Sequence, residues 1–361
     1  MLINLNQPIK PDLTKLTKYL AQVNDRGWYT NFGPLHQLFT HRLEEYLGVN
    51  NLLLVSNGTL ALQVAYKSLD ITNALTTPFS FVATASSLLW QGMETYFSEI
   101  DRNSYNLCPN KAEIAITSNH DIDAIVATHV FGNPCDVKAF EKLSGDNNIK
   151  VVYDAAHAFG VKVENQSILN YGDASTLSFH ATKVFHTIEG GAIVFKNKID
   201  FERAKRLINF GINTTNGDIT EPGINAKLNE YQCAVGLTLL DSIDHIIEHR
   251  SELFKIYRES LFDIVELPSW HHMSTTNGSY MPIKLENIDI KNKLISDLET
   301  NSIQSRGYFS PSLEKAFEEC HNFGVKNSQE IASTILCLPL HAYMTKEDVR
   351  HVVSMVKKSI G

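Results

Sequence analysis

The stretch Val151-Val152-Tyr153-Asp154-Ala155-Ala156-His157-Ala158 joins an apolar run to an acidic residue and several alanines. The unbroken run predicts a strand buried on both faces, because a strand with one solvated face would alternate apolar and polar residues. An aspartate directly after such a strand is costly unless something pairs with it. The small alanines leave room beside it for a flat ligand. Alternatively, Asp154 caps a helix, which its position equally allows.

Further apolar runs lie on either side of this strand, with helix-like stretches between them. The runs predicted as strands are 52–55, 122–128, 151–153, 176–179 and 192–195. Strands separated by helices pair in parallel, with helices on both faces of the sheet. We therefore expect an α/β fold with a mostly parallel central sheet.

The pattern changes after a mostly helical stretch from Asn229 to about Ser260. Residues 281–285 and 336–340 resemble strands, and residues 288–300 and 346–358 resemble helices. A chain of 361 residues suits two domains. We expect a large domain over residues 1–245 and a smaller C-terminal α+β domain over residues 246–361.

The composition excludes several classes of protein. The net charge is -8 and Lys and Arg do not cluster, which argues against nucleic-acid binding. No apolar run approaches a membrane span, and the N-terminus lacks the pattern of a signal peptide. The 5 cysteines are scattered and the 14 histidines show no metal-type spacing. We expect a cytoplasmic protein that binds no metal, nucleic acid or membrane.

Four polar groups follow predicted strands, where open parallel sheets bind ligands. They are the turn Ser56-Asn57-Gly58-Thr59, His129, Asp154 and the segment Ser178 to Lys183. The turn leads into a helix whose first amides can bind phosphate, unless it is an ordinary N-cap. Partial burial of Lys183 would lower its pKa and make the neutral amine a nucleophile, unless it is a surface lysine.

These motifs, with others in the same order, resemble the DegT/DnrJ/StrS family of sugar-nucleotide aminotransferases. The resemblance spans most of the chain, and the joint order of the segments is more specific than any one of them. The segments are 27–34, 56–59, 77–84, 129–134, 154–158, 178–183, 189–192, 225–232 and 338–340.

The resemblance implies a type I aminotransferase fold, the cofactor pyridoxal 5'-phosphate (PLP) and a homodimer with shared active sites. Lys183 resembles the lysine that forms the Schiff base with PLP, and Asp154 the carboxylate that pairs with the pyridinium nitrogen. Phe81 matches the aromatic residue that stacks on the ring. The residues that match phosphate contacts are Gly58, Thr59, Ser178 and, from the partner subunit, Asn229.

Two positions depart from the family pattern. His157 lies where the family often has Gln, beside the 3-hydroxyl oxygen of the cofactor. Ile208 precedes Asn209-Phe210-Gly211 where the family often has Arg, so no Arg contact is available there. Homologues with His in place of the lysine act as dehydratases, and Lys183 therefore favours transamination.

The resemblance also suggests the substrates. We expect amino transfer from L-glutamate to a dTDP-4-keto-6-deoxyhexose, giving dTDP-4-amino-4,6-dideoxyglucose for a surface polysaccharide such as the O-antigen of lipopolysaccharide. A 3-aminotransferase acting on the 3-keto isomer is the alternative. The residues expected near the nucleotide sugar, unless they are ordinary loop residues, are Trp28, Tyr29, Asn31, His186, Arg306 and Tyr308.

Two other classes of function remain for comparison. A PLP-binding regulator would share the motifs but release no 2-oxoglutarate from glutamate. A nicotinamide-dependent enzyme is disfavoured, because no Gly-x-Gly-x-x-Gly follows the first predicted strand.

Overall fold

The centre of the computed structural model, which describes residues 2–361, is an 8-stranded sheet in the order β1-β9-β8-β5-β4-β2-β3-β11. These strands are β1 (Leu52–Val55), β2 (Asn73–Thr76), β3 (Glu94–Phe97), β4 (Ala124–Thr128), β5 (Lys150–Asp154), β8 (Ala174–Ser178), β9 (Gly191–Phe195) and β11 (His321–Asn322). Neighbours are parallel except at β9, which is antiparallel to β1 and β8. The carboxyl ends of β1, β8, β5, β4 and β2 therefore lie at one edge.

All the strands predicted for the first part of the chain are present in this sheet. The strand predicted from Ile122 starts later, at Ala124, because the Asp123 carboxylate accepts hydrogen bonds from the amides of Thr72 and Asn73 at the start of β2. The sequence did not predict β2, β3 or β11. The last of these consists of two exposed polar residues, and only its pairing with β3 makes it a strand.

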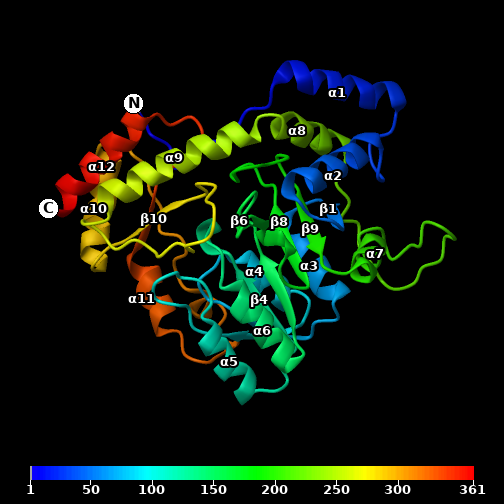
Figure 1. Ribbon diagram of the computed structural model, residues 1–361, viewed down its shortest axis with the longest axis horizontal. Helices are drawn as coiled ribbons and strands as arrows, with labels where there is room; N and C mark the ends of the chain where they lie inside the picture. Colours follow the sequence, from blue (N-terminus) through cyan, green and yellow to red (C-terminus); the bar gives the residue numbers. More distant parts are fainter. Residues whose placement is uncertain (1) are drawn as a thin grey trace.

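Helices cover both faces of the sheet (Figure 1). One face packs against α3 (Gly58–Ser68), α4 (Ala83–Leu89) and α7 (Lys198–Leu207). The other packs against α2 (Pro34–Leu47), α5 (Pro109–Ser118), α6 (Val137–Asn147) and α8 (Glu230–Leu240), and α1 (Leu13–Arg26) lies on α8. A short hairpin of β6 (Lys162–Val163) and β7 (Gln166–Ser167) precedes β8.

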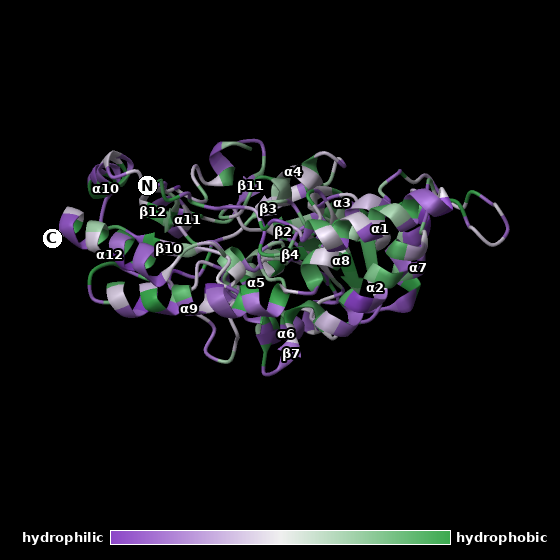
Figure 2. Ribbon diagram, turned by 90° about the horizontal axis from the view of Figure 1, so that it is seen from above, coloured by the Kyte–Doolittle hydropathy of each residue, from purple (hydrophilic) through white to green (hydrophobic). Residues whose placement is uncertain are grey.

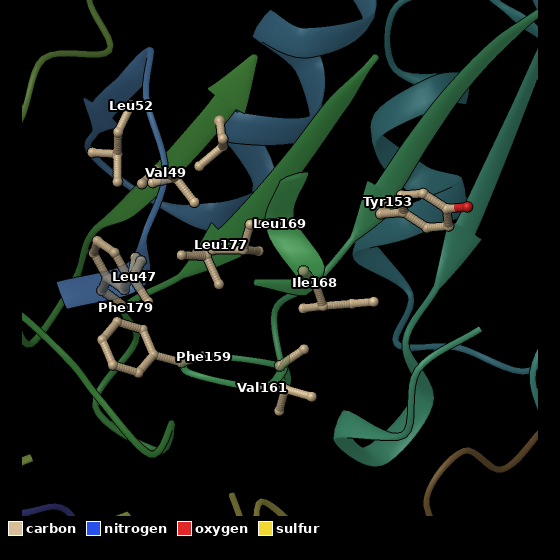
Figure 3. Packing of buried hydrophobic residues seen from close by; sticks show 14 of the residues in the cluster. Leu47, Val49, Leu52, Tyr153, Phe159, Val161, Ile168, Leu169, Leu177 and Phe179 are labelled. Carbon is tan, nitrogen blue, oxygen red and sulfur yellow. The ribbon is translucent and has the colours of Figure 1, made fainter. Parts of the chain in front are cut away.

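Side chains of β5 alternate between the two cores. Val151 and Tyr153 belong to the core under α2, α5, α6 and α8, part of which Figure 3 shows. Val152 belongs to the core under α3, α4 and α7. Because side chains alternate along a strand, Asp154 points toward the side of α3 and α4.

The second part of the chain begins with the long helix α9 (Ile243–Leu261), which leads away from the sheet (Figure 1). Strands β10 (Met281–Lys284) and β12 (Ile335–Leu338) pair there in antiparallel fashion. Helices α10 (Ile288–Thr300) and α12 (Lys346–Ile360) complete a separate core, and α11 (Lys326–Thr334) precedes β12. Peripheral helices such as α9 and α12 mix hydrophilic and hydrophobic residues, as amphipathic helices do (Figure 2).

The predicted domain boundary at residue 245 falls inside α9, and we propose it as the division between a large and a small domain. The small domain also packs against the large one. Phe309 joins Phe79 and Phe131 in one buried cluster, and β11 extends the large sheet.

Within residues 2–361, no helix combines the length and the apolar character that crossing a membrane requires. The described part of the chain also lacks any group of three or more His, Cys, Asp or Glu side chains that could hold a metal ion.

Candidate active site

The turn after β1 and the end of β8 are in close contact. A Cβ atom added to Gly58 would lie 2.8 Å from Cβ of Ser178 and 3.1 Å from its Oγ. A Cβ atom added to Gly191 would lie 2.8 Å from the backbone oxygens of Asn57 and Leu177. Only glycine allows the two segments to approach this closely. The predicted phosphate contacts at positions 58 and 178 are therefore neighbours in space.

Helix α3 starts at this contact with its amides directed to the edge of the sheet. Asn57 is its N-cap, and Oδ1 of Asn57 accepts a hydrogen bond from the amide of Leu60 at 2.8 Å. The other first-turn amides, including that of the exposed Thr59, have no partner inside the helix. Together with the positive end of the helix dipole, they are suited to bind an anion such as phosphate.

Asp154 lies buried at the end of β5 and does not cap a helix, because a turn follows it. Its Oδ2 accepts a hydrogen bond from Oγ1 of Thr84 at 2.7 Å, and its Oδ1 accepts one from the amide of Ala156 at 3.1 Å. The Thr84 hydroxyl is also bonded to that of Ser80. Burial raises the pKa of Asp154, while the two hydrogen bonds and the charge of Lys183 lower it.

Lys183 lies in the loop between β8 and β9, and its side chain is partly buried. Burial lowers the pKa of its amine to about 8, while the carboxylate of Asp154 opposes this shift. The amide of Lys183 donates to the carbonyl of His180 at 2.9 Å, and the amide of Thr187 donates to that of Phe179 at 2.9 Å. The backbone thus holds an amine of lowered pKa close enough to Asp154 for each group to shift the pKa of the other.

His157 is buried against two aromatic rings. Its ring stacks on Phe309, with centroids 5.9 Å apart, and Tyr280 tilts against it at 4.8 Å. Burial and the charge of Lys183 hold the pKa of His157 well below its ordinary value, so the imidazole is neutral. Nδ1 is buried and has no hydrogen-bond partner among residues 2–361. This nitrogen is therefore available for a hydrogen bond to a ligand or a water molecule.

The segment with Trp28, Tyr29 and Asn31 is an exposed loop before α2. The carbonyl of Tyr29 accepts a hydrogen bond from the amide of Glu230 at 3.0 Å, which fixes the loop beside the start of α8. Asn229, the N-cap of α8, is exposed, and its Nδ2 donates to Oε1 of Gln232. Loop and N-cap therefore share one exposed surface.

The small domain brings Arg306 and Tyr308 toward His157. The Arg306 guanidinium lies over the Tyr308 ring, 5.0 Å from its centroid. Tyr308 contacts the edge of Tyr280 at 5.5 Å, and Tyr280 in turn contacts His157. Tyr308 is therefore linked to His157 by one intervening tyrosine, and Arg306 is linked to it through Tyr308.

The other two aromatic predictions have opposite environments. Phe81 is 54% exposed at the start of α4, so its ring face is available to a ligand. His186 is buried, and both of its ring nitrogens are engaged: Nε2 with the carbonyl of Ile9 at 2.9 Å, and Nδ1 with the amide of Ile188 at 3.2 Å. In this conformation His186 has no polar atom left for a substrate.

Comparison with known proteins supplies the family. The model of the DegT/DnrJ/EryC1/StrS aminotransferase family matches residues 12–357. The chain belongs to this family. It is therefore an aminotransferase, as its motifs predict.

Relatives and solved structures of this family match almost the whole chain. The chain is 41% identical to a dTDP-4-amino-4,6-dideoxy-D-glucose transaminase of Shigella dysenteriae, over 99% of this chain and 98% of the relative. It is 33% identical to a transaminase of the same name from Escherichia coli, over 98% of each. The solved structure of DesI with its TDP-sugar product superimposes with a TM-score of 0.92, at 27% identity over 99% of this chain and 92% of that chain.

The family pattern did not point to a second set of residues around His157. Nδ2 of Asn277 donates to the carbonyls of His157 at 2.9 Å and Phe159 at 3.0 Å. The buried Arg250 of α9 donates to the carbonyl of Gly278 at 2.9 Å. The only local signal was the Asn-Gly pair, which is typical of turns.

The departure at position 208 has a simple structural basis. Ile208 is fully buried in the core with α3 and α7. This aminotransferase therefore has an apolar packing residue where the family often has Arg.

Proposed function

We propose that the protein transfers the amino group of L-glutamate to a dTDP-4-keto-6-deoxyhexose, giving dTDP-4-amino-4,6-dideoxyglucose, with PLP as cofactor. The observation that carries this proposal is the placement of Lys183, whose pKa is lowered to about 8, near enough to the buried Asp154 for their charges to interact. A lysine that is partly neutral near pH 7 can react with a carbonyl group. The printed names of the Shigella and Escherichia relatives support the nucleotide-sugar substrate.

The residues at the site fit four parts of PLP. The first-turn amides of α3 and the Ser178 hydroxyl suit a phosphate group. The exposed face of Phe81 suits a flat ring, and the buried Asp154 suits a protonated ring nitrogen. The unpartnered Nδ1 of His157 suits a hydroxyl oxygen at the ring edge. When bound, PLP supplies an electron sink that stabilises a carbanion at the amino-acid Cα.

Side chains of the protein then transfer and hold the protons of the reaction. Lys183 Nζ takes the proton from the substrate Cα as a general base and later returns it as an acid, which a pKa of about 8 allows near neutral pH. Asp154 holds a proton on the ring nitrogen, and Thr84 keeps its carboxylate oriented. His157, neutral because it is buried, donates a hydrogen bond rather than a charge.

We also infer a cytoplasmic homodimer that makes an amino sugar for a surface polysaccharide such as an O-antigen. The exposed Asn229 would reach the cofactor phosphate of the partner subunit. Trp28, Tyr29 and Asn31 lie on the same exposed surface, and we propose that they and the Arg306–Tyr308 segment contact the nucleotide sugar.

The test is to incubate the protein with PLP, L-glutamate and dTDP-4-keto-6-deoxyglucose and to assign the product by NMR. We expect an amino group at C4 and release of 2-oxoglutarate. Amination at C3 would identify a 3-aminotransferase, and binding of PLP without 2-oxoglutarate would identify a regulator.

The Lys183→Ala variant is the second arm of this test. Loss of the general base should lower turnover by at least about a hundredfold. Lys142→Ala is the matched control, because Lys142 is an exposed lysine of α6 paired with Asp146. Normal turnover by Lys183→Ala would contradict the proposed function.

A further inference from the structure

The residues before α1 bridge the two sides of the proposed site. We call residues 3–10 the N-terminal strap. At its start, the amide of Ile3 donates to the carbonyl of Ser302 at 2.9 Å, and the amide of Gln304 donates to the carbonyl of Ile3 at 3.0 Å. The amide of Leu5 donates to Oε1 of Gln304 at 3.0 Å. These bonds attach the strap two residues before Arg306.

Two more contacts tie the strap to the small domain. The carbonyl of Leu5 accepts a hydrogen bond from the amide of Leu340 at 3.2 Å. The amide of Lys10 donates to the Tyr343 hydroxyl at 2.8 Å. Residues 3–5 are bonded to the small domain, whereas α1 lies over α8, so the strap passes from one domain to the other (Figure 1).

The same strap contacts the loop of residues 180–189, which we call the Lys183 loop. Nδ2 of Asn6 donates to the carbonyl of Thr182, the residue before Lys183. His186 Nε2 bonds to the carbonyl of Ile9 at 2.9 Å. A carbonyl can only accept, and the Ile188 amide on the other ring nitrogen can only donate. His186 is therefore the neutral tautomer with its proton on Nε2.

These contacts connect Lys183 with the segment that contains Arg306 through a few backbone bonds. A displacement of the strap would move the Thr182 carbonyl and with it the backbone of Lys183. We propose that the N-terminal strap is a positioning element that sets Lys183 relative to the Arg306–Tyr308 segment, and that His186 is a positioning residue that does not touch the substrate. This inference rests on the proposed role of Lys183.

Two substitutions at position 186 distinguish the roles of the two ring nitrogens. In His186→Gln, the side-chain amide nitrogen reaches the place of Nε2 and keeps the bond to the strap. In His186→Asn, the side-chain oxygen reaches the place of Nδ1 and keeps the bond to Ile188, but the strap contact is lost. Asn6→Ala removes the second strap contact without changing the core, and Lys142→Ala is the control far from the strap.

The readouts are hydrogen–deuterium exchange of peptides that cover residues 180–189 and 302–308, and kcat and KM for each substrate. We expect faster exchange of both peptides in His186→Asn and Asn6→Ala, and near-normal exchange in His186→Gln. Because a small misplacement of a reacting group is enough, kcat/KM should fall about tenfold in the first two variants. Lys142→Ala should match the unaltered protein in both measurements.

Unchanged exchange and kinetics in His186→Asn and Asn6→Ala would overturn the proposal. So would a raised KM for the nucleotide sugar in both His186 variants without any change in exchange, because His186 would then contact the substrate. If His186→Asn does not fold, Asn6→Ala still allows a variant without a strap contact to be compared with Lys142→Ala. Hydrogen–deuterium exchange can be measured without turnover, so it tests the strap separately from the proposed function. Normal turnover by Lys183→Ala would contradict the proposed function and leave the exchange result unaffected.

Discussion

The chemistry of the site depends on the environments of two residues. Asp154 and Lys183 would be ordinary charged residues in water. Burial lowers the pKa of Lys183 and raises that of Asp154, and each charge partly reverses the shift of the other. Burial therefore brings the pKa of Lys183 closer to neutral pH than it is in water, and the charge of Asp154 limits that shift.

At this scale we predict how cofactor capture depends on pH. Lys183 must be neutral to react, so the rate at which the cofactor-free protein captures PLP should rise with pH, with its midpoint at about 8. Asp154→Asn removes the anion that raises the pKa of Lys183, so the midpoint should move to lower pH. Stopped-flow absorbance of the bound cofactor measures this midpoint. A midpoint that stays in place or rises in Asp154→Asn would show that the two charges are not coupled.

Among the elements, the contact of α3 with β8 and β9 forms the proposed phosphate end of the site. It depends on the absence of side chains at Gly58 and Gly191, since a Cβ at either would lie 2.8 Å from a neighbouring atom. Sequence reasoning identified the turn and the strand end separately. The sequence did not predict their contact, which depends on the position of β9 between β1 and β8.

We predict opposite effects for two glycine-to-alanine substitutions. Gly58→Ala should weaken PLP binding at least about tenfold, because the added Cβ pushes Ser178 away, and overpacking costs about 1–3 kcal/mol. Gly145→Ala in α6 meets nothing within 4 Å and should stabilise the protein by about 0.5–1 kcal/mol. Cofactor titration and thermal unfolding measure both. Equal PLP affinity of Gly58→Ala and the unaltered protein would contradict the proposed phosphate site.

On the scale of the whole molecule, the site needs more than one domain. Tyr280 and Phe309 come from the small domain and pack on His157 of the large one. The strap adds a second connection between the domains, on the side of Lys183. We propose that the exposed Asn229 also contributes to the site of a partner subunit.

If active sites are shared, mixing two inactive variants should restore activity. A hybrid of a Lys183→Ala subunit and an Asn229→Ala subunit would carry both defects in one site and none in the other. After subunit exchange we expect up to about a quarter of the unaltered activity, because half of the dimers are hybrid and each has one intact site. Each variant incubated alone is the control. No recovery despite hybrids detected by native mass spectrometry would indicate sites built from one subunit.

Much of this protein is determined by local sequence. Apolar runs specified the strands β1, β4, β5 and β9, because burial on both faces leaves no alternation. The run 176–179 also predicted β8, although that strand includes Ser175, Thr176 and Ser178. The residues that follow them, Asp154 and Lys183 among them, were then predicted to share one edge, since parallel strands end together.

Tertiary structure alone decided the rest. His186 turned inward to the strap, β11 joined the sheet, and Asn277 and Tyr280 closed around His157. The partners in each case are distant in the chain. Local periodicity reports which side of an element is buried, but it carries no information about which distant backbone group will satisfy a given donor or acceptor. That depends on how the folded elements pack.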